Sequence, residues 1–410
     1  MRRQATERLR AALRGAAVGL ALLLGGCANF ARLPPPPPAA TLGLPVLGLD
    51  NARFWIDGDP APLAREAAML AARRLDGERP VAGRLRPAHF LALSGGGDNG
   101  AFGAGLLTGW TASGTRPEFD VVTGISAGAL IAPFAFLGPE RDPQLRQLFT
   151  EVSPGDVVIF ARLLQAVLFG EALADTMPLY GLIQRYLDEE MLAAIAREYG
   201  RGRLLLIGTT NLDLQRPVAW NIGAIAASGQ PGALQLIRRI LLASAAIPGA
   251  FPPVLIDVER DGQPHQEMHV DGGAAMQVFL HPPALDLRHA ARAWRAERER
   301  TAWVIRNGRI DVEGASTGRS LFSITARSVE TLLHFGGIAD IHRIYLTTQR
   351  DGIAFRLAVI GGDFMADRPE PFDRDYMRAL FAYGEARGRS GEAWLRSPPG
   401  VRIIDRDAVR

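Results

Sequence analysis

A serine in the first half of the chain has the neighbours that a nucleophile needs. It stands in the sequence Gly124-Ile125-Ser126-Ala127-Gly128, between a predicted strand and a predicted helix. In that context a G-x-S-x-G motif forms a sharp turn that exposes the serine hydroxyl, and the flanking glycines leave room for neighbouring backbone. The helix that follows directs the positive end of its dipole at the serine. The motif therefore predicts that Ser126 is a nucleophile for acyl transfer.

A glycine-rich segment lies upstream of this serine, directly after another predicted strand. It reads Ser94-Gly95-Gly96-Gly97-Asp98-Asn99-Gly100. Successive glycines expose backbone N–H groups, which can surround the oxyanion of a tetrahedral intermediate. One alternative is a dinucleotide-binding loop, which requires an acidic residue at the end of the next strand, where this chain has the serine motif instead. A plain tight turn is another alternative, whereas a Walker A loop is excluded because no Lys-Ser or Lys-Thr pair follows the glycines.

An aspartate further along the chain is the candidate base for the serine. Asp271-Gly272-Gly273 follows a short predicted strand, so the carboxylate can lie at the edge of a sheet where the sites of α/β proteins gather. An Asp-Gly pair is also common in ordinary turns. Its functional meaning depends on the two motifs that precede it.

The three motifs in this order resemble those of the patatin-like phospholipases over residues 89–285. The sequence Ala243-Ser244-Ala245-Ala246-Ile247-Pro248 also resembles a conserved block of that family. The resemblance implies a Ser–Asp dyad without histidine, backbone oxyanion donors around Gly96, Gly97 and Asp98, and hydrolysis of lipid acyl esters without a cofactor. One position departs from the family pattern, because Asn99 replaces the usual Arg or Lys.

Two other kinds of site compete with the dyad. A Ser-Asp-His order would suit an α/β-hydrolase triad, and four histidines follow Asp271, although none lies in a known motif: His281, His289, His334 and His342. His265 and His269 lie close in sequence to the aspartate, but no third ligand accompanies them, so no metal site is expected. A catalytically silent lipoprotein that binds lipid or a partner with the same fold is the alternative to an enzyme.

Apolar stretches alternate with helical patterns from residue 89 onward, which is typical of a largely parallel sheet. We predict an α/β fold, a three-layer sandwich with a mostly parallel central sheet, as in patatin-like proteins. The predicted strands are residues 89–93, 119–123, 204–209, 268–270, 302–305 and 355–360. The predicted helices are residues 61–75, 101–110, 127–137, 233–246 and 324–333.

The first residues predict an exported, lipid-anchored protein. An arginine-rich start leads into a short apolar run and Leu24-Gly25-Gly26-Cys27, which resembles a bacterial lipobox. Cys27 is the only cysteine, so it has no disulfide partner within the chain. The run of prolines at 34–38 is a stiff spacer, and Ala28 resembles lipoproteins of a Gram-negative outer membrane, facing the periplasm. The alternative is an ordinary secretory signal with an incidental cysteine.

These features predict four parts of the chain: a signal peptide (1–26), an anchored spacer with a short helical segment (27–88), a catalytic domain (89–285) and a C-terminal extension that completes the fold (286–410). The formal charge is +3, of which residues 1–26 contribute +4, so the remainder carries −1 and nucleic acid is not an expected partner. The apolar residues 157–169 predict a buried helix, with an acyl-chain pocket or a membrane-surface element as alternatives.

Overall fold

The computed structural model describes residues 32–76, 85–152, 177–293, 298–311 and 316–401, together with residues 155, 159–160, 174–175 and 314. The predicted signal peptide and Cys27 lie outside the described residues. So does most of the apolar stretch 157–169, of which only Ile159–Phe160 is described. These two residues form strand β4, which pairs with β5 (Ala174–Asp175) rather than belonging to a helix.

A single sheet of nine strands forms the centre of the molecule. Five neighbouring strands are parallel, and in spatial order they are β6 (Leu204–Asn211), β3 (Val121–Ile125), β2 (Ala88–Leu93), β10 (Arg300–Arg306) and β11 (Ala354–Val359). Two strands continue the sheet beyond β6 in antiparallel pairs, β7 (Arg216–Asn221) and β1 (Arg53–Trp55). On the edge of β6 that β3 occupies, the last three residues of β6 pair antiparallel with β9 (Gln263–Asp271), which pairs with β8 (Val254–Arg260). The parallel strands therefore end at one common edge, here called the carboxyl edge.

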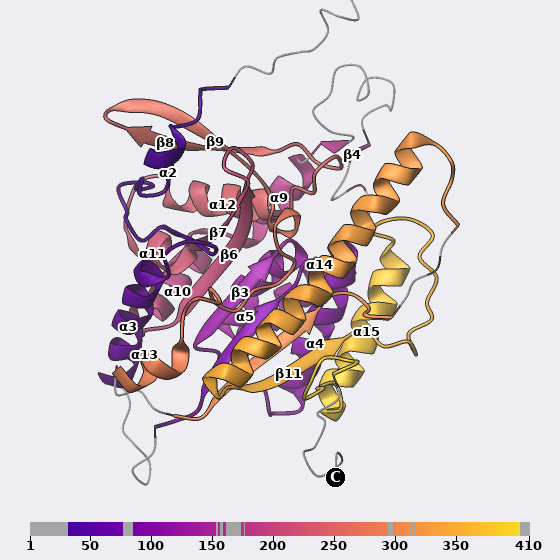
Figure 1. Cartoon of the computed structure of the whole chain (residues 1–410). Coiled ribbons are helices and arrows are strands. Elements are labelled where there is room, and N and C mark those ends of the chain that lie inside the picture. Colours follow the sequence, from indigo (N-terminus) through magenta and orange to yellow (C-terminus); the bar gives the residue numbers. More distant parts are fainter. Residues whose placement is uncertain are drawn as a thin grey trace, which may run out of the picture.

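Helices cover both faces of this sheet, which gives the three layers that the sequence predicts. Along β6, Leu205 and Ile207 belong to one core, whereas Leu204 and Leu206 belong to the other, as expected for side chains that alternate across a strand. The first face packs against α4 (Gly100–Ala112), α5 (Ala127–Leu137), α6 (Asp142–Thr150), α9 (Met177–Tyr186), α10 (Glu189–Gly200), α12 (Ala233–Ser244) and α15 (Arg374–Ser390). The second face packs against α3 (Ala61–Asp76), α13 (Leu287–Ala293) and α14 (Leu321–Asp351), and Figure 1 shows α14 crossing it diagonally.

Three of the differences in extent between predicted and observed elements matter for the fold. Strand β3 starts and ends two residues later than predicted, so it runs directly into the serine motif. The predicted strand 268–270 is the end of the nine-residue β9. The helix predicted at 324–333 continues for 31 residues through Gly336 and Gly337, which resemble a helix end in sequence. A β-carbon at Gly337 would overlap the Arg306 guanidinium, so this glycine permits close packing instead of ending the helix.

The sheet takes strands from both sides of the region that resembles patatin-like enzymes. Strand β1 lies before residue 89 and pairs with β7, while β10 and β11 lie after residue 285 and continue the parallel block. The small α2 (Pro38–Thr41) and α11 (Ile222–Ala227) complete the described helices. Among the described residues, no helix combines the length and hydropathy needed to cross a bilayer.

Candidate active site

The serine motif forms a strained turn at the carboxyl edge of β3. Ser126 has φ 54° and ψ −125°, a conformation that residues with a β-carbon rarely adopt. A β-carbon at Gly124 would collide with the Gly128 carbonyl, and one at Gly128 would collide with the Leu93 carbonyl. Helix α5 begins at the next residue, so its N-terminus lies at the serine. These are the features of a nucleophile elbow.

Asp271 lies at the end of β9 and meets the serine. The Ser126 hydroxyl hydrogen-bonds to its carboxylate, and the Gly273 N–H donates to Asp271 Oδ1 at 2.7 Å. Both side chains are buried. Burial raises the pKa of Asp271 to about 7, although the hydrogen bonds from Ser126 and Gly273 oppose the shift. A carboxyl group with such a pKa is suited to general-base catalysis near neutrality.

One short segment at the end of α12 connects both of these residues. The Ser244 hydroxyl accepts a hydrogen bond from the Ser126 N–H at 3.0 Å and donates one to the Gly208 carbonyl at 2.6 Å. Two residues later, the Ala246 carbonyl accepts from the Asp271 N–H at 2.9 Å. The block Ala243–Pro248, noted in the sequence only as a family resemblance, therefore holds the elbow and the aspartate in one geometry.

The glycine-rich loop lies beside the elbow. A β-carbon at Gly95 would be 3.1 Å from that of Ser126. The Gly95 N–H is not available to a ligand, because it donates to the Gln277 carbonyl at 3.0 Å. Within the described part of the chain, no acceptor binds the N–H groups of Gly96, Gly97 or Asp98. The backbone N–H groups of Gly96, Gly97 and Asp98 are therefore free to bind an oxyanion, whereas the N–H of Gly95 is already used.

The side chains of the loop face the C-terminal part of the chain. The Asp98 carboxylate accepts from Arg368 Nε at 2.8 Å and from the Phe372 N–H at 3.0 Å. Asn99, at the position usually held by a cation in the family, accepts a hydrogen bond from the Tyr376 hydroxyl at 2.6 Å. Asp98 thus binds the guanidinium of Arg368, and Asn99 attaches the loop to Tyr376 of α15.

Sequence reasoning missed three residues that position the loop. Asn307, just after β10, donates from its backbone and side chain to the Ser94 hydroxyl (2.9 Å) and carbonyl (2.8 Å). Gln277 links the loop to the Asp-Gly-Gly turn, since its Nε2 also donates to the Gly273 carbonyl at 3.3 Å. Asp340 of α14 accepts from the Gln277 N–H at 2.6 Å. A polar residue directly after a buried strand, as at Asn307, was the signal available in the sequence.

The competing sites of the sequence do not assemble at this edge. Among the described residues, no histidine hydrogen-bonds to Ser126 or Asp271: the rings of five bind elsewhere, and no ring hydrogen bond joins His289 or His334 to the site. The same part of the chain holds no cluster of three potential metal ligands. Asp120 lies at the start of β3 and binds Arg86 at 2.6 Å, so it is at the wrong edge to accept a ribose beside the glycine loop.

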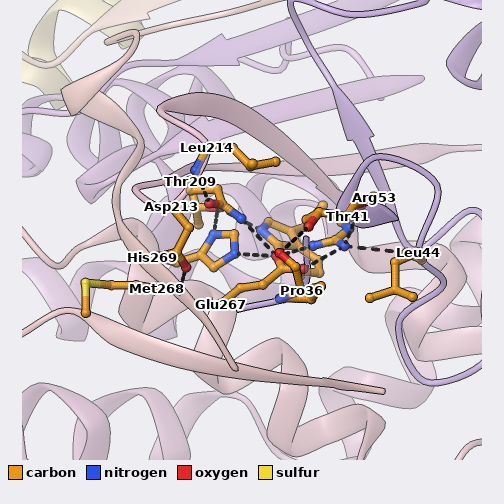
Figure 2. A network of polar contacts seen from close by, with 12 residues as sticks. Pro36, Thr41, Leu44, Arg53, Thr209, Asp213, Leu214, Glu267, Met268 and His269 are labelled. Atoms are coloured by element: carbon orange, nitrogen blue, oxygen red, sulfur yellow. Dashed lines mark hydrogen bonds and ion pairs between the residues drawn. The ribbon is translucent and has the colours of Figure 1, made fainter. Parts of the chain in front are cut away.

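A second buried carboxylate, that of Glu267, lies on the same strand as Asp271. Figure 2 shows its polar contacts. Glu267 accepts hydrogen bonds from Arg53 at 2.5 and 3.0 Å and from Asn211 at 2.9 Å. Its fourth contact is His269 Nε2 at 3.2 Å, and His269 Nδ1 lies 3.0 Å from the Thr209 hydroxyl. Because a carboxylate can only accept, Nε2 carries the proton and Nδ1 accepts from Thr209.

The charges of this network are compensated, unlike that of Asp271. Burial alone would raise the pKa of Glu267, but the His269 hydrogen bond and the Arg53 guanidinium outweigh it and lower the pKa to about 2. Burial lowers the pKa of His269, so its ring is neutral at pH 7. The network ties β9 to Arg53 of β1 and, through it, to the carbonyls of Thr41 and Leu44.

An apolar cavity of about 130 Å³ lies at the other end of the parallel strands, between α3 and the segment around α13. Its lining includes Leu63, Ala88, Val121, Leu204 and Leu285. Ser126 and Asp271 do not line it. The cavity is therefore separate from the site at the carboxyl edge.

The part of the chain that carries this site matches a known family. The family model "Patatin-like phospholipase" matches residues 91–284, which include the glycine loop, the serine motif and the Asp-Gly-Gly turn. No curated protein matches the chain.

Two solved structures are similar. The crystal structure of VipD from Legionella pneumophila has a TM-score of 0.33 and 12% identity, covering 77% of this chain and 69% of that chain. The type III effector protein ExoU has a TM-score of 0.22 and 15% identity, covering 76% of this chain and 54% of that chain. The family indicates a lipid-hydrolysing esterase. The chain therefore carries a patatin-like phospholipase domain at residues 91–284.

Proposed function

We propose that this protein is a lipid acyl hydrolase, of phospholipase A or lysophospholipase type, that uses Ser126 and Asp271 as a catalytic dyad. The observation that carries the proposal is the hydrogen bond between a strained, buried serine and a carboxyl group whose pKa is raised to about 7. A group that is half ionised near neutrality can both take a proton and return it. The family of the domain supports a lipid ester as the substrate.

The proposed reaction follows from these positions. The Asp271 carboxylate takes the Ser126 proton while Oγ attacks the acyl carbonyl carbon. The oxyanion accepts hydrogen bonds from the unused N–H groups of Gly96, Gly97 and Asp98, aided by the N-terminus of α5. When the C–O bond to the alcohol breaks, Asp271 returns the proton to the leaving oxygen. Water then attacks the acyl-serine by the same steps, which releases the fatty acid and restores the enzyme.

A fluorophosphonate probe tests the nucleophile, and a lipid panel tests the substrate class. We expect the probe to label the wild-type protein but not Ser126→Ala. Wild type should release fatty acid from at least one member of a panel of phospholipids, lysophospholipids and neutral esters. A folded protein that neither reacts with the probe nor cleaves any of these lipids is a silent lipid- or partner-binding member of the family, and the proposal is then wrong.

The oxyanion loop can be tested at Gly97. A β-carbon at Gly96 would overlap the Asn307 carbonyl and disturb packing, whereas a β-carbon at Gly97 meets no atom within 4 Å. Gly97 has φ +58°, so Gly97→Ala strains the backbone that carries the donors without a collision. Loss of one donor reduces turnover by about 10²–10³-fold. Near-normal turnover in folded Gly97→Ala would remove this loop from the mechanism.

We also propose that Cys27 is acylated and anchors the protein in a membrane, by way of the outer-membrane lipoprotein route and facing the periplasm. The support is its place after Leu24-Gly25-Gly26 and before the proline run. Cys27→Ser should leave the protein unprocessed or soluble in the exported fraction. Detergent fractionation that finds this variant processed and membrane-bound as before would contradict the anchor.

A further inference from the structure

Helix α14 is much longer than the strands that it crosses. It ends at Asp351, and β11 begins at Ala354, so its C-terminus lies at the start of the parallel strands. A helix of 31 residues is roughly 46 Å long, whereas the six residues of β11 span only about 20 Å. Since α14 runs back across β11, its first half must extend past the carboxyl edge (Figure 1).

Two contacts locate the point where α14 passes this edge. Gly337 packs against the guanidinium of Arg306, the last residue of β10. Asp340 accepts a hydrogen bond from Gln277, whose carbonyl holds Gly95 of the oxyanion loop. Residues 321–336, about 24 Å of helix measured along its axis, therefore lie beyond these contacts on the side of the candidate active site.

The projecting half carries apolar side chains that the protein does not cover. Leu321, Ile324, Leu332 and Phe335 are 84, 49, 73 and 62% exposed. No described side chain between residues 321 and 336 is buried. The four residues form two pairs with Ser328 between them on the same side of the helix. Exposed large apolar residues gathered on one side of a surface element mark an interaction site more often than scattered ones do.

These four residues form one stripe. At 100° per residue, their spacing places them within an arc of about 80° on the helix. Ile341, Ile344 and Thr348, which α14 buries against the sheet, lie on the opposite side of the helix axis. The stripe therefore faces away from the protein. Arg327 and Glu330, the charged residues of this half, lie outside the arc and pair with each other at 3.1 Å.

The start of the described chain lies at the same edge. Arg32 binds Asp213, which follows the carboxyl end of β6, at 2.5 and 3.1 Å. Pro34 lies along the part of β9 that extends past β6 and accepts from His265 at 3.0 Å. Arg32 lies five positions after Cys27 in the sequence, a span of at most about 18 Å. A lipid anchor at Cys27 would thus enter the membrane near the end of the molecule that carries Ser126.

We propose that the first half of α14 docks on a lipid surface and holds the carboxyl edge, with Ser126, against the membrane in which the substrate resides. The proposal rests on the proposed lipid hydrolase function and adds the surface by which the enzyme meets its substrate. An uncharged apolar stripe on an amphipathic helix is suited to insertion into the interfacial region of a bilayer. The nearby anchor and the active site determine which end of the protein faces the lipid.

The helix itself supplies a matched control for this proposal. The test variant is Leu332→Glu with Phe335→Glu, in the processed protein reconstituted on phosphatidylethanolamine–phosphatidylglycerol vesicles. The control is Leu346→Glu, which is 66% exposed on the same side of α14 but near the start of the parallel strands. Each protein is assayed for fatty acid released from the vesicle lipid and for hydrolysis of a soluble short-chain ester. Thermal melts verify folding.

We expect the double variant to lose about tenfold or more of its rate on vesicles, because two large apolar side chains no longer enter the lipid. Its rate on the soluble ester should stay within about twofold of wild type, since neither residue contacts the site. Leu346→Glu should keep both rates. An unchanged vesicle rate in the double variant, or an equal loss in the control, would overturn the docking proposal.

A second measurement decides the question without turnover. A nitroxide attached at Phe335→Cys should lose access to aqueous relaxation agents when vesicles are present, whereas one at Leu346→Cys should not. If wild type hydrolyses neither substrate, the proposed function fails while this readout still decides the docking. Light scattering measures whether the protein forms dimers. If wild type is a dimer and the double variant Leu332→Glu with Phe335→Glu is a monomer, the stripe binds a second copy of the chain and the proposal is overturned.

Discussion

Glu267 and Asp271 are both buried on the same strand, yet their pKa values are shifted in opposite directions. Arg53, Asn211 and His269 satisfy Glu267, and its pKa falls to about 2. Asp271 receives hydrogen bonds from Ser126 and Gly273 but has no described cationic partner, and its pKa rises to about 7. Burial acts on both groups, so the presence or absence of a compensating cation decides the direction.

The difference separates two tasks that one strand performs. A carboxylate that stays ionised at every relevant pH is suited to joining β9 to β1, because its hydrogen bonds persist. A carboxyl group near half ionisation is suited to exchanging a proton with a serine. Four residues apart, the strand carries a permanent structural charge and a titratable candidate base. The following predictions test that division.

The largest expected effect is on turnover. Ser126→Ala, Asp271→Asn and the double variant should each lose about 10⁴-fold or more of kcat, by similar and non-additive amounts, since the residues act as a unit. Steady-state kinetics on a cleaved ester measures this. His265→Gln is the matched control, because its ring binds the Pro34 carbonyl rather than the site. A folded histidine variant as inactive as Ser126→Ala would restore the triad hypothesis.

Removing the cation of the compensated pair should cost stability instead. Arg53→Met leaves Glu267 buried without its charge partner, for which we expect a loss of about 3–5 kcal/mol in the free energy of unfolding. Arg216→Met is the control: Arg216 also stacks on Trp55, but its pair with Asp57 is exposed and contributes less than about 1 kcal/mol. Chemical denaturation measures both. Equal losses in the two variants would mean that Arg53 stabilises the protein through packing on Trp55 and not through charge compensation.

Removing the uncompensated carboxyl group, that of Asp271, should instead raise the free energy of unfolding. The pKa of Asp271 is higher folded than unfolded, so its contribution to stability is complete below about pH 4 and is lost as pH rises to about 7. Asp271→Asn does not titrate and keeps an acceptor for the Gly273 N–H. The variant should match wild type near pH 4 and exceed it above pH 7, by up to about 4 kcal/mol. A difference that does not change with pH would contradict the raised pKa.

The smallest effect is the pH dependence of wild-type turnover. If Asp271 must be ionised to accept the serine proton, kcat/KM should fall about tenfold per pH unit below about pH 7 and level off above it. The ordinary aspartate value, near 4, would allow activity to persist into acid, so burial reverses that expectation. A profile that stays flat down to pH 5 would exclude Asp271 as the titrating base.

The sequence by itself determined the order of the three motifs and predicted the chemistry of the candidate site. Local patterns sufficed for this: glycines that neighbouring backbone requires at 124 and 128, a serine between strand and helix, and an Asp-Gly-Gly turn after a strand. The alternation of apolar and helical stretches likewise determined the α/β fold. Boundaries were less accurate where a local signal misled, as at Gly336 and Gly337, which pack in the middle of a helix.

Only the tertiary structure decided the environment of these residues. The pKa of Asp271 depends on which charges surround it. Three residues outside the motifs hold the glycine-rich loop: Gln277, Asn307 and Asp340. The outward stripe of α14 could not be recognised from the sequence, because the same helix buries a second apolar face further along. Which of two apolar faces meets the core is settled by packing between elements, and a linear pattern does not contain that information.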